Sequence, residues 1–215
     1  MRRRMAPLML VVVVMALAPQ SAKAQHPPLF SPEQLGKLEG PDRDAWQRPD
    51  QIMDKLLIAE GSTVADLGAG GGWFTMRLAD RVGPNGKVYA EDVQSQMIDA
   101  ITRRTARAGV TNVKPILGTS SDPRLPGPVD AVLIVDAYHE FEHPVVMLGS
   151  LAKALKPNGR IGIVEFKKDG LGPGPPMDER VDAEPVIRDA EAAGLKLVSR
   201  ENFLRYQYML VFTRR

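Results

Sequence analysis

A run of glycines that follows a short apolar segment constrains the fold of this chain more than any other feature. Residues 64–72 read VADLGAGGG, and a helical pattern begins at Trp73. Glycine tolerates positive φ and lets the backbone approach a ligand closely, and the N-terminus of the following helix supplies unpaired backbone N–H groups. A strand, a glycine turn and a helix in this order predict a binding loop for a nucleotide-like ligand.

The segments that follow Thr63 predict the fold class. β-rich runs alternate with helical patterns, which is typical of a parallel sheet with helices on both faces. The expected strands are residues 63–67, 87–92, 113–117, 129–136 and 160–166. The expected helices are residues 73–81, 95–108, 144–155 and 182–193.

The last third of the chain adds a loop and two strands. Residues 167–178 are rich in glycine and proline, so we expect a loop over the strand ends. Residues 195–200 and 207–213 lie close enough in the chain to pair as an antiparallel hairpin at the sheet edge. We therefore expect an α/β, Rossmann-like domain with a seven-stranded sheet, mostly parallel with an antiparallel C-terminal hairpin, and helices on both faces.

The first 24 residues have the order of a secretory signal peptide. Three arginines precede an apolar stretch over residues 8–18, and Ala22-Lys23-Ala24 forms a small-x-small cleavage site before Gln25. About eleven apolar residues are too few for a spanning helix of roughly twenty, so cleavage is favoured over a stable membrane anchor. We expect a cut after Ala24, a periplasmic or secreted protein, an N-terminal extension over residues 25–50 and one domain over residues 51–215.

Charge and cysteine content narrow the function classes. Without the first 24 residues the chain has 24 basic and 26 acidic residues, a net charge of −2. This balance offers no electrostatic footprint for nucleic acid, so a small-molecule partner is favoured. The chain has no cysteine, which excludes thiolate nucleophiles, disulfides and cysteine zinc sites, and three scattered histidines give no reason to expect a metal.

The glycine loop distinguishes between two cofactors. A dinucleotide fingerprint would need Gly or Ala where Trp73 stands, which disfavours an NAD-dependent oxidoreductase. The spacing of Asp66, Gly68, Gly70 and Gly72 resembles the first motif of class I S-adenosylmethionine-dependent methyltransferases, in particular small-molecule enzymes of the type 11 and type 25 groups. This resemblance implies that the Asp66 carboxylate supports the turn and the methionine end of adenosylmethionine, which carries an ammonium and a sulfonium charge.

The next two strands supply further candidate cofactor residues. Asp92 ends the second strand, where a carboxylate accepts hydrogen bonds from ribose hydroxyls, and the preceding Glu91 is expected to point to the other face. Many relatives have an acid after the third strand that meets the adenine amino group, and Thr119 occupies that position here. Asp122 is the alternative partner for the adenine, unless it is an ordinary turn residue.

The end of the fourth strand carries the candidate catalytic residues Asp136 and His139. Ligands of open α/β sheets bind outside the carboxyl ends of the strands, so these side chains should face the transferring methyl group. The segment resembles small-molecule methyltransferases of the quinone and arsenite type, although the missing cysteines exclude arsenite chemistry. His139, with an ordinary pKa near 6.5, is either a general base or a structural residue that caps the following helix or satisfies backbone groups.

Three functions follow from these observations. The leading hypothesis is an exported adenosylmethionine-dependent methyltransferase that acts on a small-molecule acceptor. The second is a catalytically silent exported domain that binds a ligand or partner in the same cleft, because adenosylmethionine is made in the cytoplasm. The NAD-dependent oxidoreductase is the least favoured. The acceptor and the oligomeric state have no signal in the sequence.

Overall fold

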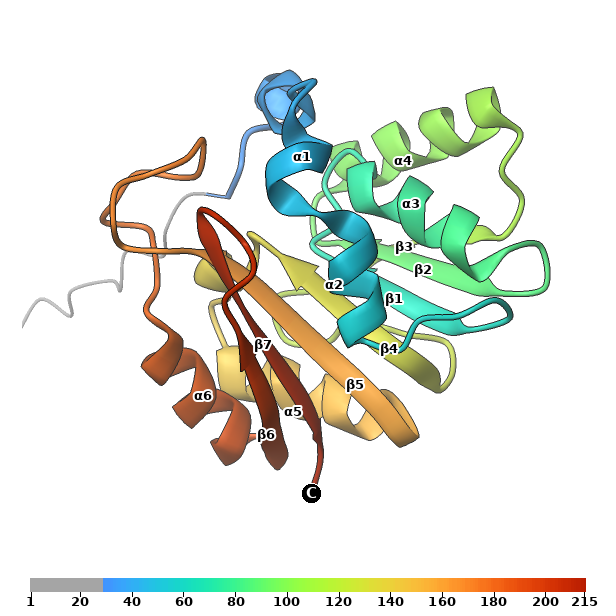
Figure 1. Cartoon of the computed structure of the whole chain (residues 1–215). Coiled ribbons are helices and arrows are strands. Elements are labelled where there is room, and N and C mark those ends of the chain that lie inside the picture. The colour runs from blue at the N-terminus through green and yellow to red at the C-terminus, as the bar shows by residue number, and fades with distance from the viewer. Residues whose placement is uncertain (1–28) are drawn as a thin grey trace, which may run out of the picture.

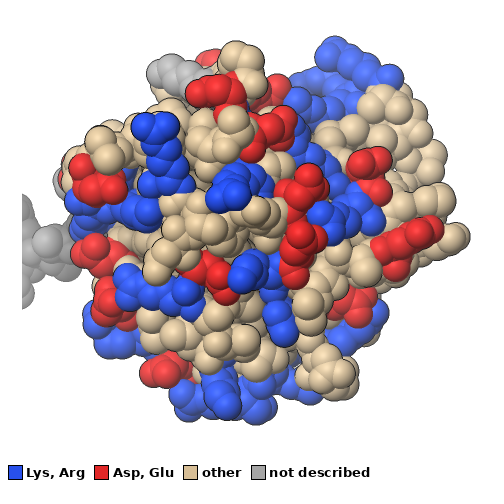
Figure 2. Space-filling view, viewed as in Figure 1, with Lys and Arg blue, Asp and Glu red and all other residues tan. Residues whose placement is uncertain are grey.

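The computed structural model of the chain describes residues 29–215. The expected signal peptide and its cleavage site after Ala24 lie outside these residues. Among the residues that the structure describes, no helix combines the length and the apolar character needed to cross a membrane. Basic and acidic side chains are intermixed on the face of the molecule drawn in Figure 2.

One seven-stranded sheet forms the centre of the molecule (Figure 1), with the strand order β3-β2-β1-β4-β5-β7-β6. The strands are β1 (Thr63–Leu67), β2 (Lys87–Asp92), β3 (Val113–Leu117), β4 (Val129–Val135), β5 (Leu155–Phe166), β6 (Leu195–Glu201) and β7 (Gln207–Arg214). Strands β1 to β5 are parallel, and β7 pairs antiparallel with both β5 and β6. The predicted C-terminal hairpin is therefore present, with β6 at one edge of the sheet and β7 between β6 and β5.

Helices cover both faces of this sheet. The helical elements are η1 (Pro32–Glu39), α1 (Arg43–Gln47), α2 (Pro49–Lys55), α3 (Trp73–Val82), α4 (Ser95–Ala108), η2 (Tyr138–Glu140), α5 (Pro144–Ala154) and α6 (Ala183–Ala192). Helices α2 and α3 contribute to one apolar core, and α5 and α6 contribute to the other. The predicted α/β fold class is confirmed.

The apolar character of the central strands follows from this double cover. In β4, Ala131 and Leu133 belong to the core under α2 and α3, while Val132 and Ile134 belong to the core under α5 and α6. A strand covered on both faces is apolar along its length rather than alternating with polar residues. Polar side chains are therefore concentrated at the strand ends, where the candidate site lies.

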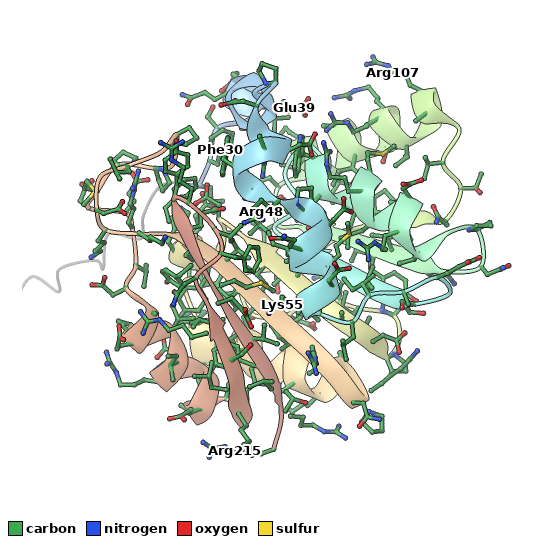
Figure 3. All side chains as sticks on the ribbon, in the orientation of Figure 1. Phe30, Glu39, Arg48, Lys55, Arg107 and Arg215 are labelled. Carbon is green, nitrogen blue, oxygen red and sulfur yellow. The ribbon has the colours of Figure 1, made fainter. Side chains whose placement is uncertain are left out.

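The N-terminal extension is continuous with the domain. Its expected boundary at residue 50 falls inside α2, whose Ile52 and Met53 are buried in the core. Buried Gln47 donates from Nε2 to Gln207 Oε1 at 2.9 Å and so joins α1 to β7. Figure 3 shows Glu39, Arg48 and Lys55 following one another down this side of the molecule. The extension therefore packs on the fold as part of it.

Candidate active site

A cavity of about 660 Å³ opens at the carboxyl ends of β1, β2 and β4. The chain order changes direction between β1 and β4, and the crevice at such a switch point is the usual ligand site of open α/β sheets. Residues 29–31 and part of η1 and α1 line one side of the cavity, and residues 173–176 of the glycine and proline loop line another. The cavity is large enough for a nucleoside cofactor together with a small acceptor.

The glycine loop forms the floor of the cavity as predicted. Gly68, Gly70 and Gly72 have φ values of 67°, 54° and 82°, a region that favours glycine. A Cβ at Gly68 would lie 2.5 Å from the Cβ of Ala137, so no larger residue fits there. Gly68 and Gly70 line the cavity, whereas Gly72 lies behind them at the start of α3.

Asp66 lies at the end of β1 and lines the cavity. Its Oδ2 accepts a hydrogen bond of 2.6 Å from the Thr75 hydroxyl. Burial disfavours the charged carboxylate and raises the pKa of Asp66 to about 6, although the hydrogen bond from Thr75 opposes this change. A cationic ligand group beside Asp66 would therefore stabilise its ionised form.

Asp92 connects the end of β2 to the glycine loop. Its Oδ2 accepts the Gly70 N–H at 3.0 Å, and its Oδ1 accepts the Gln94 N–H at 2.9 Å. A carboxylate has about four acceptor positions, so these two bonds leave acceptor capacity for ligand hydroxyls. Burial raises the pKa of Asp92 above its ordinary value. Asp92 therefore lines the cavity beside the glycine loop, and its contact with the ribose stays a prediction.

Glu91 also lines the cavity, although it was not predicted to be a cofactor residue. Its side chain turns into the space beside Gly118, where a Cβ would lie 1.8 Å from Glu91 Oε1. This oxygen is buried without a hydrogen-bond partner. Burial and the neighbouring Asp92 charge raise the pKa of Glu91 to about 8. The glycine that follows β3 was the available signal for this placement.

Thr119 and Asp122 are not among the residues that line the cavity. They form a turn in which the Thr119 N–H donates to the Asp122 carbonyl at 2.9 Å and the Asp122 N–H donates to the Thr119 hydroxyl at 3.0 Å. The Asp122 carboxylate accepts the Arg124 N–H at 2.8 Å. The turn interpretation of Asp122 therefore holds, and Ser120 is the residue of this loop that reaches the cavity.

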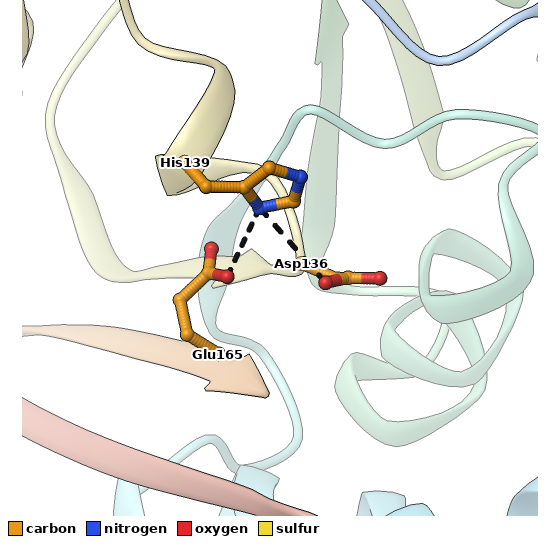
Figure 4. Close-up of side chains that lie close together, drawn as sticks. All are labelled: Asp136, His139 and Glu165. Atoms are coloured by element: carbon orange, nitrogen blue, oxygen red, sulfur yellow. Dashed lines mark hydrogen bonds and ion pairs between the residues drawn. The ribbon is translucent and has the colours of Figure 1, made fainter. Parts of the chain in front are cut away.

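Three ionisable side chains meet at the ends of β4 and β5 (Figure 4). His139 Nδ1 lies 3.0 Å from Glu165 Oε2 and 3.9 Å from Asp136 Oδ1. Glu165 is fully buried, and its other oxygen accepts the Tyr138 N–H at 2.8 Å. Asp136 and His139 line the cavity, as predicted. Glu165 does not line it but is hydrogen-bonded to His139, and it was not predicted from the sequence.

Asp136 has a strained backbone conformation, and burial and neighbouring charges shift the pKa values of Asp136 and His139. Asp136 has a φ of 53°, and its N–H donates to the Val164 carbonyl at 2.8 Å, which stabilises the strained conformation. Burial raises the pKa of Asp136 to about 7, and the Glu165 charge adds to this effect. Burial alone would lower the pKa of His139, but the hydrogen bond and charge of Glu165, with Asp136, raise it to about 9.

Two roles of these side chains can be compared directly with the geometry. The contacts of the His139 ring are with carboxylates, and His143 occupies the N-cap of α5, which disfavours the capping role for His139. One donor atom from each of Asp136, His139 and Glu165 lies within 4.8 Å of the others, a spacing that divalent cation sites share. The hydrogen bond between His139 and Glu165 accounts for the short spacing of these two groups without a metal ion. The expectation that the site holds no metal therefore stays a prediction.

Residues 29–31, which line one side of the cavity, are hydrogen-bonded to the segments that follow β2 and β4. The Phe30 N–H donates to Glu140 Oε1, and Gln94 Nε2 donates to the Phe30 carbonyl, each at 2.9 Å. On the other side, buried Arg180 donates to carbonyl groups of the glycine and proline loop, including that of Pro175 at 2.9 Å. The hydrogen bonds of Phe30 fix residues 29–31 beside the cavity, and those of Arg180 fix the conformation of the glycine and proline loop.

Comparison with known proteins agrees with this geometry. Residues 64–159 match the family model described as a methyltransferase domain. An uncharacterized methyltransferase of Mycobacterium tuberculosis is 35% identical over 122 residues, which are 56% of this chain and 46% of that protein. The nocamycin O-methyltransferase of Saccharothrix syringae is 31% identical over 131 residues, which are 60% of this chain and 44% of that protein. The chain thus spans about half the length of the curated relatives it matches.

A solved structure shares nearly the whole fold. The crystal structure of a SAM-dependent methyltransferase from Aquifex aeolicus has a TM-score of 0.79 and 28% sequence identity, and covers 85% of this chain and 98% of that chain. The predicted Rossmann-like fold is therefore confirmed, and the match of residues 64–159 to a methyltransferase family model agrees with the predicted family. These similarities do not favour the oxidoreductase alternative.

Proposed function

We propose that this protein transfers the methyl group of S-adenosylmethionine to a small-molecule acceptor bound in the same cavity. One observation carries the proposal. The glycine loop, with its positive φ values, is hydrogen-bonded through the Gly70 N–H to the Asp92 carboxylate, so the two predicted cofactor-binding features form one site. The cofactor is S-adenosylmethionine, in agreement with the sequence prediction.

The residues of the cavity fit the two ends of this cofactor. Asp92 and the unpaired Oε1 of Glu91 offer acceptors for hydroxyl and amino groups of the adenosine. Asp66 lies beside the glycine loop, where its carboxylate suits the ammonium and sulfonium charges of the methionine end. The absence of a side chain at Gly68 and Gly70 lets the ligand lie directly on the backbone.

The methyl transfer itself asks little of the protein beyond alignment and exclusion of water. When bound, the cofactor would supply a methyl group on a positive sulfur for transfer to a lone pair of the acceptor, with adenosylhomocysteine as the leaving group. An acceptor that carries a proton must also lose it. His139 faces the cavity, and its Nε2 points away from both carboxylates, so this nitrogen can receive the proton (Figure 4).

Glu165 acts on this step through His139. Its hydrogen bond to Nδ1 fixes the orientation of the imidazole and stabilises the imidazolium that forms when Nε2 takes a proton. The high pKa of His139 means that the ring is protonated near neutral pH before the cofactor binds. A sulfonium charge nearby lowers this pKa, so cofactor binding favours the neutral ring that accepts a proton.

The lining of the acceptor region supports a small molecule rather than a polymer. Phe30, Phe141 and residues 173–176 give it an apolar surface. Residues 29–31 and the glycine and proline loop cover it. No nucleic acid partner and no stable membrane anchor are expected. A screen of quinols, phenols and small thiols with methyl-labelled cofactor would identify the acceptor class.

Calorimetric titration tests the proposed function directly. The protein beginning at Gln25 should bind adenosylmethionine and adenosylhomocysteine and should not bind NAD. Failure to bind either adenosyl ligand would refute the proposal. Tight binding without methyl transfer to any acceptor in the screen would instead favour the catalytically silent binding domain.

We also propose that the protein is exported and that its signal peptide is removed after Ala24. The basic, apolar and small-x-small order of residues 1–24 supports this proposal. Intact mass measurement on fractionated cells should find a periplasmic or secreted chain that begins at Gln25. A chain with Met1 or its immediate neighbour intact in the cytosol would overturn it.

A further inference from the structure

We propose that Arg43, on helix α1, binds the carboxylate of the cofactor's methionine end and makes the site selective for adenosyl ligands that carry this group. The inference rests on the proposed function, since it assumes an adenosyl ligand in the cavity. Arg43 lies outside the segment that matches the methyltransferase family model. The N-terminal extension would thus complete the cofactor site.

The charges of the cavity create the need for such a residue. The methionine end carries a carboxylate as well as its two positive groups, and the residues around it include Asp66, Asp136 and Glu39. A carboxylate placed among these acids is repelled unless a cation lies beside it. Among the described residues that line the cavity, Arg43 is the only lysine or arginine, and the protonated His139 already lies against Glu165 and Asp136.

The position of Arg43 suits this role. Its guanidinium interacts electrostatically with Asp66 at the end of β1 and with Asp136 at the end of β4, so it lies near the loop where the methionine end is expected. Burial lowers the pKa of Arg43 to about 10, although both carboxylates oppose this change. The group therefore stays charged at neutral pH, and its half-buried position strengthens a bond to a ligand carboxylate.

Neighbouring side chains hold the guanidinium in place before a ligand arrives. Its carbon lies 4.1 Å from the centre of the Trp73 ring, and its Nε donates to Gln47 Oε1. Gln47 is itself fixed by its hydrogen bond to Gln207. The planar fork of N–H donors of a guanidinium matches the geometry of a carboxylate.

Arg77 provides a matched control. Its guanidinium carbon lies 3.4 Å from the centre of the same Trp73 ring, and its side chain forms an ion pair with Asp44. Arg77 is not among the residues that line the cavity. Removing Arg77 therefore changes the stacking on Trp73 without removing a charge from the cavity.

The test compares two ligands that differ in one group. Adenosylhomocysteine has the carboxylate, and its decarboxylated analogue keeps the ammonium and lacks the carboxylate. By calorimetry, the wild type should bind adenosylhomocysteine about 10- to 100-fold more tightly than the analogue, the range of a charge-assisted hydrogen bond. Arg43→Gln should remove this preference, Arg43→Lys should keep part of it, and Arg77→Gln should leave it intact.

The outcomes separate this inference from the proposed function. If the wild type binds neither ligand, the proposed function fails and this inference fails with it. If the wild type binds both ligands equally, the methyltransferase proposal stands and the role of Arg43 is refuted, even if no variant folds. Equal loss of both ligands in a folded Arg43→Gln protein, judged by thermal unfolding, would also refute it, because that result describes a structural role.

Discussion

Replacing Glu165 by Gln should change the protonation of His139. In the wild type, burial by itself lowers the pKa of His139, but the hydrogen bond and charge of Glu165, with Asp136, raise it to about 9. Glutamine keeps the size and an acceptor oxygen but removes the charge, so burial should dominate and bring the pKa to about 6.5 or below. A fall from about 9 to about 6.5 corresponds to roughly 3 kcal/mol of stabilisation of the imidazolium.

The same contact links stability to pH. A histidine whose pKa is raised in the folded state stabilises the fold below its unfolded pKa of about 6.5, and this contribution is lost as the pH rises through about 9. In Glu165→Gln the folded pKa is no longer raised, so this contribution should be absent. The free energy of unfolding of the wild type, relative to the variant, should therefore fall by roughly 3 kcal/mol between about pH 6 and pH 9.

An NMR titration of the imidazole signals checks the pKa, and chemical denaturation across the same pH range checks the stability. The His139→Asn spectrum assigns the signal, and exposed His143 provides a second imidazole in the same spectra. A His139 pKa that stays near 9 in Glu165→Gln would refute the reasoning. A wild-type pKa near 6.5 would refute it as well, because the hydrogen bond to Glu165 would then have no electrostatic effect.

Four further predictions concern the cofactor loop and the acceptor side. Asp92→Ala should weaken adenosylmethionine binding by about 1–3 kcal/mol in calorimetry, since it leaves buried groups unpaired; unchanged affinity would show that the ribose is held elsewhere. Gly68→Ala should weaken binding and stability by roughly 1–3 kcal/mol, because its φ is positive and its Cβ would meet Ala137, and Ala137→Gly should relieve only the contact part in a thermal unfolding assay. His139→Gln should leave cofactor affinity nearly intact and lower turnover by about 10²–10⁴-fold, with a wild-type kcat/KM that rises with pH up to about 9, the pKa of the free enzyme; a flat pH profile with much of the rate retained would limit His139 to positioning. Treatment with a chelator should leave calorimetric binding of adenosylhomocysteine unchanged, and a loss restored by a divalent cation would overturn the expectation of no metal.

The sequence by itself determined the elements of the fold and the cofactor loop. Strands β1, β2 and β3 have the bounds predicted for them, because β-rich runs with glycines beside them, Gly68, Gly86 and Gly118, are local signals. Asp66, Asp92 and Asp136 could be recognised because each stands at the end of a predicted strand, and parallel strands bring their carboxyl ends to one edge. Placement at a strand end does not need knowledge of the neighbouring strand.

The side-chain directions of Thr119, Asp122 and Glu91 could not be derived from the positions of the strand ends. Thr119 and Asp122 follow β3 as the sequence indicates, but they bond to each other in a turn and leave the cavity to Ser120. Glu91 enters the cavity because Gly118, on the segment after the neighbouring strand, leaves room for it. The free energy of a local turn and the space left by a missing Cβ decided these positions.

Only the tertiary structure decided which distant residues complete the site. The parallel register that pairs Val135 with Val164 brings Glu165 beside Asp136, and no short window of sequence states that register. Arg43 reaches the cavity because α1 docks on β7 through Gln47, so its role depends on contacts made by the whole domain. Local periodicity indicates which segments form strands and helices, whereas long-range packing fixes which charged side chains meet, and the chemistry of this site depends on both.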